Sequence, residues 1–96
     1  MSDTERNALP NELAENAAPA RIDERLDCTG LRCPLPLLRT KQMLHRLAAG
    51  AVLEVTATDA GAQRDIPAFV TLSPHRLLAA RAESGQFLFW IEKGAG

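Results

Sequence analysis

Residues 28–50, CTGLRCPLPLLRTKQMLHRLAAG, decide the fold, because here a turn leads through two prolines into one long amphipathic run. A helix leaves its first backbone N–H groups unpaired in any case, so proline is well tolerated in the first turn. Pro34 and Pro36 therefore mark the start of a helix. Gly50 marks its end, since glycine commonly follows the last helical turn. We predict a helix over residues 34–49.

The apolar residues of this helix divide between two faces. Residues at three-to-four spacing should form the buried stripe, and these are Leu37, Thr40, Leu44, Leu47 and Ala48. Leu35 and Leu38 fall on a different face, so we expect both to be exposed. Exposed leucines often mark a contact surface. With the neighbouring Arg39 and Lys41 they form a candidate docking site for a partner protein. The alternative is that the N-terminal tail or a loop covers the two leucines.

Segments of alternating polarity before and after this helix predict strands. They cover residues 22–28, 52–58, 76–83 and 86–93. Ser84-Gly85 should form the tight turn between the last two strands. A second helix is expected over residues 64–72, with Asp65 as its cap and Pro67 in its first turn. The order of elements is therefore βαβαββ.

This order predicts an α/β (α+β) two-layer sandwich, in which a four-stranded mixed sheet carries both helices on one face. The first βαβ unit should be parallel and right-handed, and the last two strands should form an antiparallel hairpin. The second face of the sheet then stays bare. Leu88 and Trp90 should point to it, which predicts exposed apolar surface there.

Length and charge limit the organisation of the chain. Its 96 residues are 46 % hydrophobic and 24 % charged, which suits one small domain. We assign residues 21–96 to this domain and residues 1–20 to a disordered N-terminal tail. The tail holds four acidic residues and one basic residue, and the domain ten basic and eight acidic, so their net charges are −3 and +2. So small a positive charge does not favour nucleic-acid binding.

The expected compartment follows from the cysteines and from the N-terminus. No apolar run is long enough to cross a membrane, and the N-terminus lacks the basic and apolar regions of a secretory signal. Two cysteines without such a signal favour the reducing cytoplasm over a disulfide scaffold. We therefore expect a cytoplasmic protein.

Cys33 is the residue whose position points to chemistry. A single cysteine is more often structural than reactive, but this one lies at the predicted helix start, on a corner stiffened by Pro34 and Pro36. The positive end of the helix dipole and the neighbouring Arg32 should lower the pKa of its thiol. Because the thiolate is the reactive form of cysteine, we predict an activated, accessible nucleophile.

Cys28 lies five residues before Cys33 and shares the parity of the inward-facing residues of its strand, so a structural role is expected. A regulatory disulfide between the two cysteines is the alternative. Two cysteines at this spacing, with no further cysteine or suitably placed histidine, do not favour a metal site.

The residues around Cys33 resemble the TusA/SirA family of sulfur-carrier proteins, closest to the TusA branch. Residues 26–36, LDCTGLRCPLP, are similar to the opening signature of that family, including its Cys-Pro-x-Pro (CPxP) motif. Further similar blocks are Thr58-Asp59, residues 64–69 (RDIPAF), residues 75–78 (HRLL) and the closing Phe87, Ile91 and Lys93. The resemblance covers residues 22–94.

The resemblance implies a sulfurtransferase-type persulfide carrier that needs no cofactor and no metal. Cys33 would hold the sulfur, supported by Arg32, Pro34 and Pro36. Asp59 resembles a family position near the cysteine, and the alternative role for Asp59 is that of a loop residue or a helix cap. The carrier would take sulfur from a donor such as a cysteine desulfurase and pass it to an acceptor protein in a sulfur relay, for tRNA thiolation or sulfur oxidation. Its partners would be proteins, without direct contact to nucleic acid or membrane, and it would be a monomer or a weak dimer.

Two other classes of function remain open. The first is a non-catalytic interaction or regulatory module, whose fold would resemble the C-terminal domain of a translation initiation factor. The weak charge of the domain and the lack of aromatic residues interleaved on a basic face disfavour RNA binding by such a module. The second is a thiol-redox sensor that uses Cys28 and Cys33.

Overall fold

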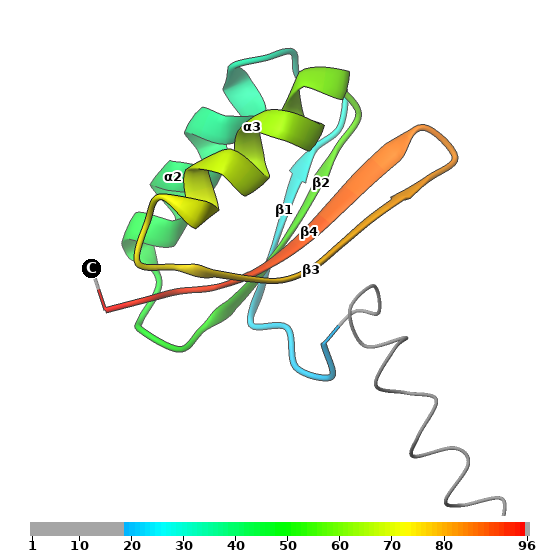
Figure 1. Cartoon of the computed structure of the whole chain (residues 1–96). Coiled ribbons are helices and arrows are strands. Elements are labelled where there is room, and N and C mark those ends of the chain that lie inside the picture. Colours follow the sequence, from blue (N-terminus) through cyan, green and yellow to red (C-terminus); the bar gives the residue numbers. More distant parts are fainter. Residues whose placement is uncertain (1–18, 96) are drawn as a thin grey trace, which may run out of the picture.

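The structure, a computed structural model, describes residues 19–95 and contains six elements in the predicted order (Figure 1). The strands are β1 (Glu24–Cys28), β2 (Val52–Ala57), β3 (Arg76–Glu83) and β4 (Gln86–Glu92), and the helices are α2 (Leu35–Arg46) and α3 (Ala60–Thr71). The predicted tail, residues 1–20, lies almost entirely outside the described residues. Neither helix within the described residues is long and apolar enough to cross a membrane.

The four strands form one mixed sheet in the order β1-β2-β4-β3. β1 is parallel to β2, whereas β4 is antiparallel to both β2 and β3. Both helices lie on one face of this sheet, as Figure 1 shows, and the hydrophobic core fills the space between the two layers. The predicted α/β two-layer sandwich is therefore confirmed.

The hairpin between β3 and β4 also has the predicted turn. Ser84 and Gly85 have φ angles of 52° and 79°, so both lie in the left-handed region. Two such residues form a turn whose twist matches that of the flanking strands. Glycine adopts this conformation without steric cost, which explains its place in the turn.

Helix α2 is shorter than the predicted residues 34–49. It ends at Arg46, and the chain becomes extended at Leu47. Lys93, a buried cation at the end of β4, explains this early stop, because its Nζ donates a hydrogen bond to the carbonyl of Leu44. Cations are favourable at the C-terminal end of a helix. The backbone of Lys93 also bonds to Gly50 and Ala51, which ties the end of β4 to the segment after α2.

The two predicted faces of α2 are largely confirmed. Thr40 and Leu44 are buried, and Leu37 and Leu47 are half-buried, whereas Ala48 lies beyond the helix and is exposed. The buried hydroxyl of Thr40 donates to the carbonyl of Pro36 at 2.8 Å. Leu35 and Leu38 are 41 % and 47 % exposed, as expected.

Helix α3 begins four residues earlier than predicted. Asp59 is its cap, since its Oδ2 accepts a hydrogen bond from the backbone N–H of Gly61 at 2.9 Å. Asp65 is thus not the cap but lies inside the helix, and Pro67 lies beyond the first turn. Pro67 removes a helical hydrogen bond to the carbonyl four residues earlier. That carbonyl belongs to Gln63, an exposed residue, so water can replace the bond.

We expect Asp59→Ala to lower the free energy of unfolding by about 1 kcal/mol, the usual effect of losing a helix cap. Asp59→Ser is the matched control, because serine can also accept the bond from Gly61. Urea unfolding of both variants measures the difference. An equal loss in the two variants would show that the cap does not stabilise α3.

The prediction of exposed apolar surface on the second sheet face was wrong for Trp90, which is only 1 % exposed. Its Nε1 donates to Glu54 Oε2 at 2.9 Å, and the guanidinium of Arg81 lies 5.4 Å from the ring centroid. Residues 19–23 precede β1 and lie at the lower end of the sheet in Figure 1. This segment is held in place by Asp23, which exchanges two hydrogen bonds with the backbone of Val52. Leu88 is half-buried.

Candidate functional site

The loop between β1 and α2 exposes Cys33 to solvent, and hydrogen bonds hold this loop in place. The N–H of Leu31 donates to the carbonyl of Cys28 at 3.1 Å, and the N–H of Gly30 donates to Thr58 Oγ1 at 2.9 Å. The second bond joins this loop to the end of β2. Gly30 has a φ angle of +83°, which favours glycine at the turn.

The two prolines stiffen the start of α2. Pro34 takes the cap position, one residue later than Cys33, and Pro36 is buried in the first turn. The N–H of Leu35 donates to the carbonyl of Arg32 at 2.8 Å. Because neither proline has an N–H and that of Leu35 is already used, this helix start has few donors to offer the sulfur. Cys33 was predicted at or beside the cap, and it precedes the cap by one residue.

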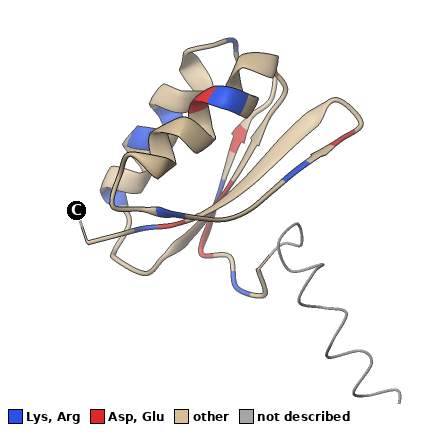
Figure 2. Cartoon of the chain, in the orientation of Figure 1, with Lys and Arg blue, Asp and Glu red and all other residues tan. Residues whose placement is uncertain are grey.

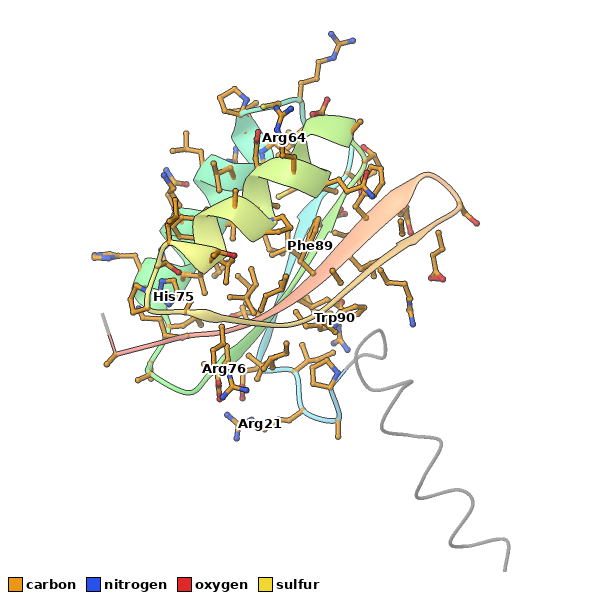
Figure 3. All side chains as sticks on the ribbon, viewed as in Figure 1. Arg21, Arg64, His75, Arg76, Phe89 and Trp90 are labelled. Atoms are coloured by element: carbon orange, nitrogen blue, oxygen red, sulfur yellow. The ribbon has the colours of Figure 1, made fainter. Side chains whose placement is uncertain are left out.

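The side chain of Cys33 points to α3 and meets Asp65 there. Its Sγ donates a hydrogen bond to Asp65 Oδ2 at 3.0 Å. The other carboxylate oxygen, Oδ1, accepts from Arg64 Nε at 3.3 Å. Figure 3 shows Arg64 on the first half of α3, beside the loop that carries the cysteine. The sulfur thus lies between the first turns of two helices.

Gly61 allows this close approach. A Cβ atom at residue 61 would lie 3.2 Å from Cys33 Cβ, 3.4 Å from Cys33 Sγ and 2.9 Å from Asp59 Oδ2. Any side chain at residue 61 would therefore crowd both the cysteine and the cap. Glycine at this position lets the loop and the helix pack directly against each other.

The predicted lowering of the pKa of the Cys33 thiol was wrong. The pKa of Cys33 is raised rather than lowered, first because Asp65 accepts the hydrogen bond of the protonated thiol and second because of partial desolvation. The negative charges of Asp65 and Asp59 act in the same direction. Arg64 opposes them by lowering the pKa, but its effect is the smallest of these.

The same contact affects Asp65 in the opposite way. The hydrogen bond from Cys33 lowers the pKa of Asp65, and the bond from Arg64 lowers it further. Asp65 is therefore a carboxylate at neutral pH, held between a neutral donor and a cation. The sequence predicted Asp65 as a helix cap, so neither of these contacts was expected. The Asp59-x-Gly61 spacing was the available signal for the earlier helix start.

Cys28 is fully buried in the core between the sheet and the helices, as its parity predicted. Burial raises the pKa of its thiol, which makes it a poor nucleophile. Both cysteines are free thiols. Among residues 19–95, no group of three or more His, Cys, Asp or Glu side chains is arranged to hold a metal ion.

The predicted docking residues lie on the outer surface of α2, next to Cys33. Pro34, Leu37, Leu38 and Lys41 line a shallow hollow that begins beside the cysteine. Lys41 also reaches α3, where its Nζ lies 5.2 Å from the ring centroid of Phe69. Arg39 lines a separate hollow, to which Leu26 of β1 also contributes. Figure 2 shows several basic residues along this helix.

Comparison with known proteins identifies the family. The family model described as "Sulfurtransferase TusA" matches residues 24–93. The chain belongs to the TusA family. Two similar relatives are named "Sulfur carrier protein TusA": that of Pseudomonas entomophila is 47 % identical over 76 % of this chain and 91 % of its own, and that of Allochromatium vinosum is 43 % identical over 77 % and 97 %.

A solved structure supports the fold of this TusA-family chain. The crystal structure of the SirA-like protein from Desulfitobacterium hafniense superposes with a TM-score of 0.60, at 23 % identity, over 75 % of this chain and 99 % of that one. This likeness concerns the fold alone. The region matched by the TusA family model contains Cys33, Asp59, Gly61 and Asp65, so the whole sulfur environment lies within it.

Proposed function

We propose that this TusA-family protein is a sulfur carrier that holds transferred sulfur as a persulfide on Cys33. The observation that supports it is an exposed cysteine on a pinned corner, in a chain 47 % identical to a protein named as a sulfur carrier. Cys28 is fully buried, so an approaching protein can reach Cys33 but not Cys28. For the same reason a redox sensor that uses both thiols is disfavoured.

The transfer step needs no oxidant or reductant. The Cys33 sulfur attacks the outer sulfur of a donor persulfide, R–S–SH, and the S–S bond of the donor breaks. The donor cysteine leaves as a thiolate and takes up the proton that Cys33 released. Cys33 then carries the outer sulfur as S–SH, and an acceptor thiol removes it by the same reaction in the next step.

The donor is a protein persulfide such as that of a cysteine desulfurase, and the acceptor is a second protein of a sulfur relay, serving tRNA thiolation or sulfur oxidation. We place this exchange in the cytoplasm, where thiols stay reduced. The resting thiol of Cys33 is protonated, since its pKa is raised. The thiolate, which is the attacking form, is therefore the minor form of Cys33 in the free protein.

The test is intact-mass measurement after incubation with a cysteine desulfurase and cysteine. We expect the protein to gain one sulfur atom, and we expect dithiothreitol to remove it. A protein that stays at its unmodified mass while a known carrier is loaded in the same mixture would refute the proposed function.

The exposed leucines of α2 supply the docking surface in this proposal. Leu35 and Leu38 lie within one turn of the start of α2, and the hollow lined by Leu38 begins beside Cys33. A relay needs weak and exchangeable contacts, which a small apolar patch can provide. Arg39 and Lys41 flank this patch and would favour a partner with an acidic rim.

We expect Leu38→Glu to leave the fold intact and to slow sulfur transfer to or from Cys33 by about tenfold, which corresponds to about 1.4 kcal/mol of lost contact. Leu72→Glu is the matched control, because Leu72 is 89 % exposed and follows the C-terminal end of α3. The loading rate is followed by mass after rapid quenching. Equal rates in both variants would place the docking surface elsewhere.

A further inference from the structure

We propose that Asp65 sets how tightly Cys33 holds sulfur: its carboxylate stabilises the empty thiol and disfavours the loaded persulfide. The inference rests on the proposed function, and it assigns a positioning role to a residue that the docking surface does not include. A carrier with this property accepts sulfur less completely but passes it on more readily. The argument depends on one hydrogen bond, on the charges around it and on the packing of Gly61.

The hydrogen bond distinguishes the two states of the carrier. In the empty state the thiol donates to Asp65 Oδ2 at 3.0 Å. In the loaded state this sulfur is bonded to carbon and to the second sulfur, so it has no hydrogen to donate. Loading therefore removes a favourable contact to a charged acceptor, and hydrogen bonds to charged groups are the stronger ones.

The charges disfavour the loaded state further. A persulfide is a stronger acid than the corresponding thiol, so its outer sulfur carries negative charge at neutral pH. The charged groups that act on the Cys33 sulfur are Asp65, Asp59 and Arg64, all from α3 and its cap. Two carboxylates outweigh one guanidinium, and Arg64 is already paired with Asp65. An anionic outer sulfur is therefore repelled from α3.

The packing around Cys33 determines in which direction the second sulfur extends. Sγ lies so close to the first turn of α3 that a Cβ atom on Gly61 would be 3.4 Å away. A second sulfur has no room between Cys33 and that turn. It must extend to the solvent side, which is the side that an acceptor thiol can reach. The empty thiol is thus held against α3, and the loaded sulfur is turned outward.

Sulfur exchange with glutathione measures the effect at equilibrium. The full-length protein is mixed with glutathione persulfide and glutathione under anaerobic conditions, and the loaded fraction is read by intact mass. We expect Asp65→Asn to raise the equilibrium constant for loading about tenfold, the change that corresponds to one pKa unit. Glu83→Gln removes the same charge at the exposed β3–β4 hairpin and should leave it unchanged.

The pH profile of alkylation supplies a second readout that a purely structural role would not move. The midpoint for iodoacetamide should shift to lower pH in Asp65→Asn, because the carboxylate that favours the protonated thiol is gone. Arg64→Gln replaces an exposed residue outside the core. It should shift the midpoint of alkylation to higher pH and lower the equilibrium constant for sulfur loading. If Asp65→Asn folds poorly, the shift and the loading of Arg64→Gln still test the inference.

The outcomes separate the inference from the proposed function. If the native protein gains no sulfur from glutathione persulfide or from a desulfurase, the carrier function fails. If the native protein loads and Asp65→Asn loads equally or less, the function stands and the role of Asp65 is refuted. A slower loading of Asp65→Asn with a higher alkylation midpoint would instead make Asp65 a proton acceptor, which also contradicts the inference.

Discussion

Replacing Cys33 by serine is expected to abolish sulfur loading completely, because a hydroxyl cannot form a persulfide. Cys33 is exposed, whereas Cys28 is fully buried between the sheet and the helices. Only the first of the two sulfurs can approach the outer sulfur of a donor, so the loss should be total rather than partial. The same intact-mass measurement after incubation with a cysteine desulfurase checks this expectation.

Cys28→Ser is the matched control for this experiment. It should still gain one sulfur atom at Cys33, provided that the variant is folded, since the serine places a hydroxyl in the hydrophobic core. Circular dichroism before loading establishes the fold. Sulfur on Cys28 in the Cys33→Ser protein, or equal labelling of both thiols in the native chain, would contradict the assignment.

Trp90→Ala is expected to destabilise the protein by about 3–5 kcal/mol, the usual range for removing a buried large aromatic side chain. Trp90 is 1 % exposed although it lies on the sheet face without helices. The substitution removes its packing, leaves Glu54 without the indole N–H and takes the ring away from Arg81. A loss of this size is a large part of the about 5–15 kcal/mol that stabilises a typical domain.

Urea unfolding measures this loss, with Leu88→Ala as the comparison. Leu88 is on the same face and the same strand but only half-buried, so its truncation should cost clearly less. Equal costs for the two variants would mean that Trp90 is not part of a packed layer on that face.

The sequence predicted the architecture because the decisive signals were local. Alternation of polarity located every strand to within two residues, and Ser84-Gly85 predicted the hairpin turn. The covering of Trp90 was not predictable in this way. It involves Glu54 of β2 and Arg81 of β3, which approach the ring only once the strands are paired in the sheet.

The corner that carries Cys33 was predicted in position, but the contacts of its sulfur were not. The prolines located Cys33 on a rigid corner, and its exposure agrees with that expectation. The predicted lowering of its pKa considered only the helix that follows the cysteine. Asp65 is 32 residues away in the chain and acts through tertiary packing, which no local pattern reveals. The misplaced start of α3 hid it, because an aspartate taken as a cap is not expected to face a thiol.

The link between Lys93 and the end of α2 has a consequence for cooperativity. Lys93 bonds to the carbonyl of Leu44 through its side chain and to Gly50 and Ala51 through its backbone. The last turn of α2 therefore cannot fray unless the end of β4 detaches as well. Amide hydrogens in that turn should therefore exchange with solvent only through an opening that also releases the C-terminal end of β4, one of the two central strands of the sheet.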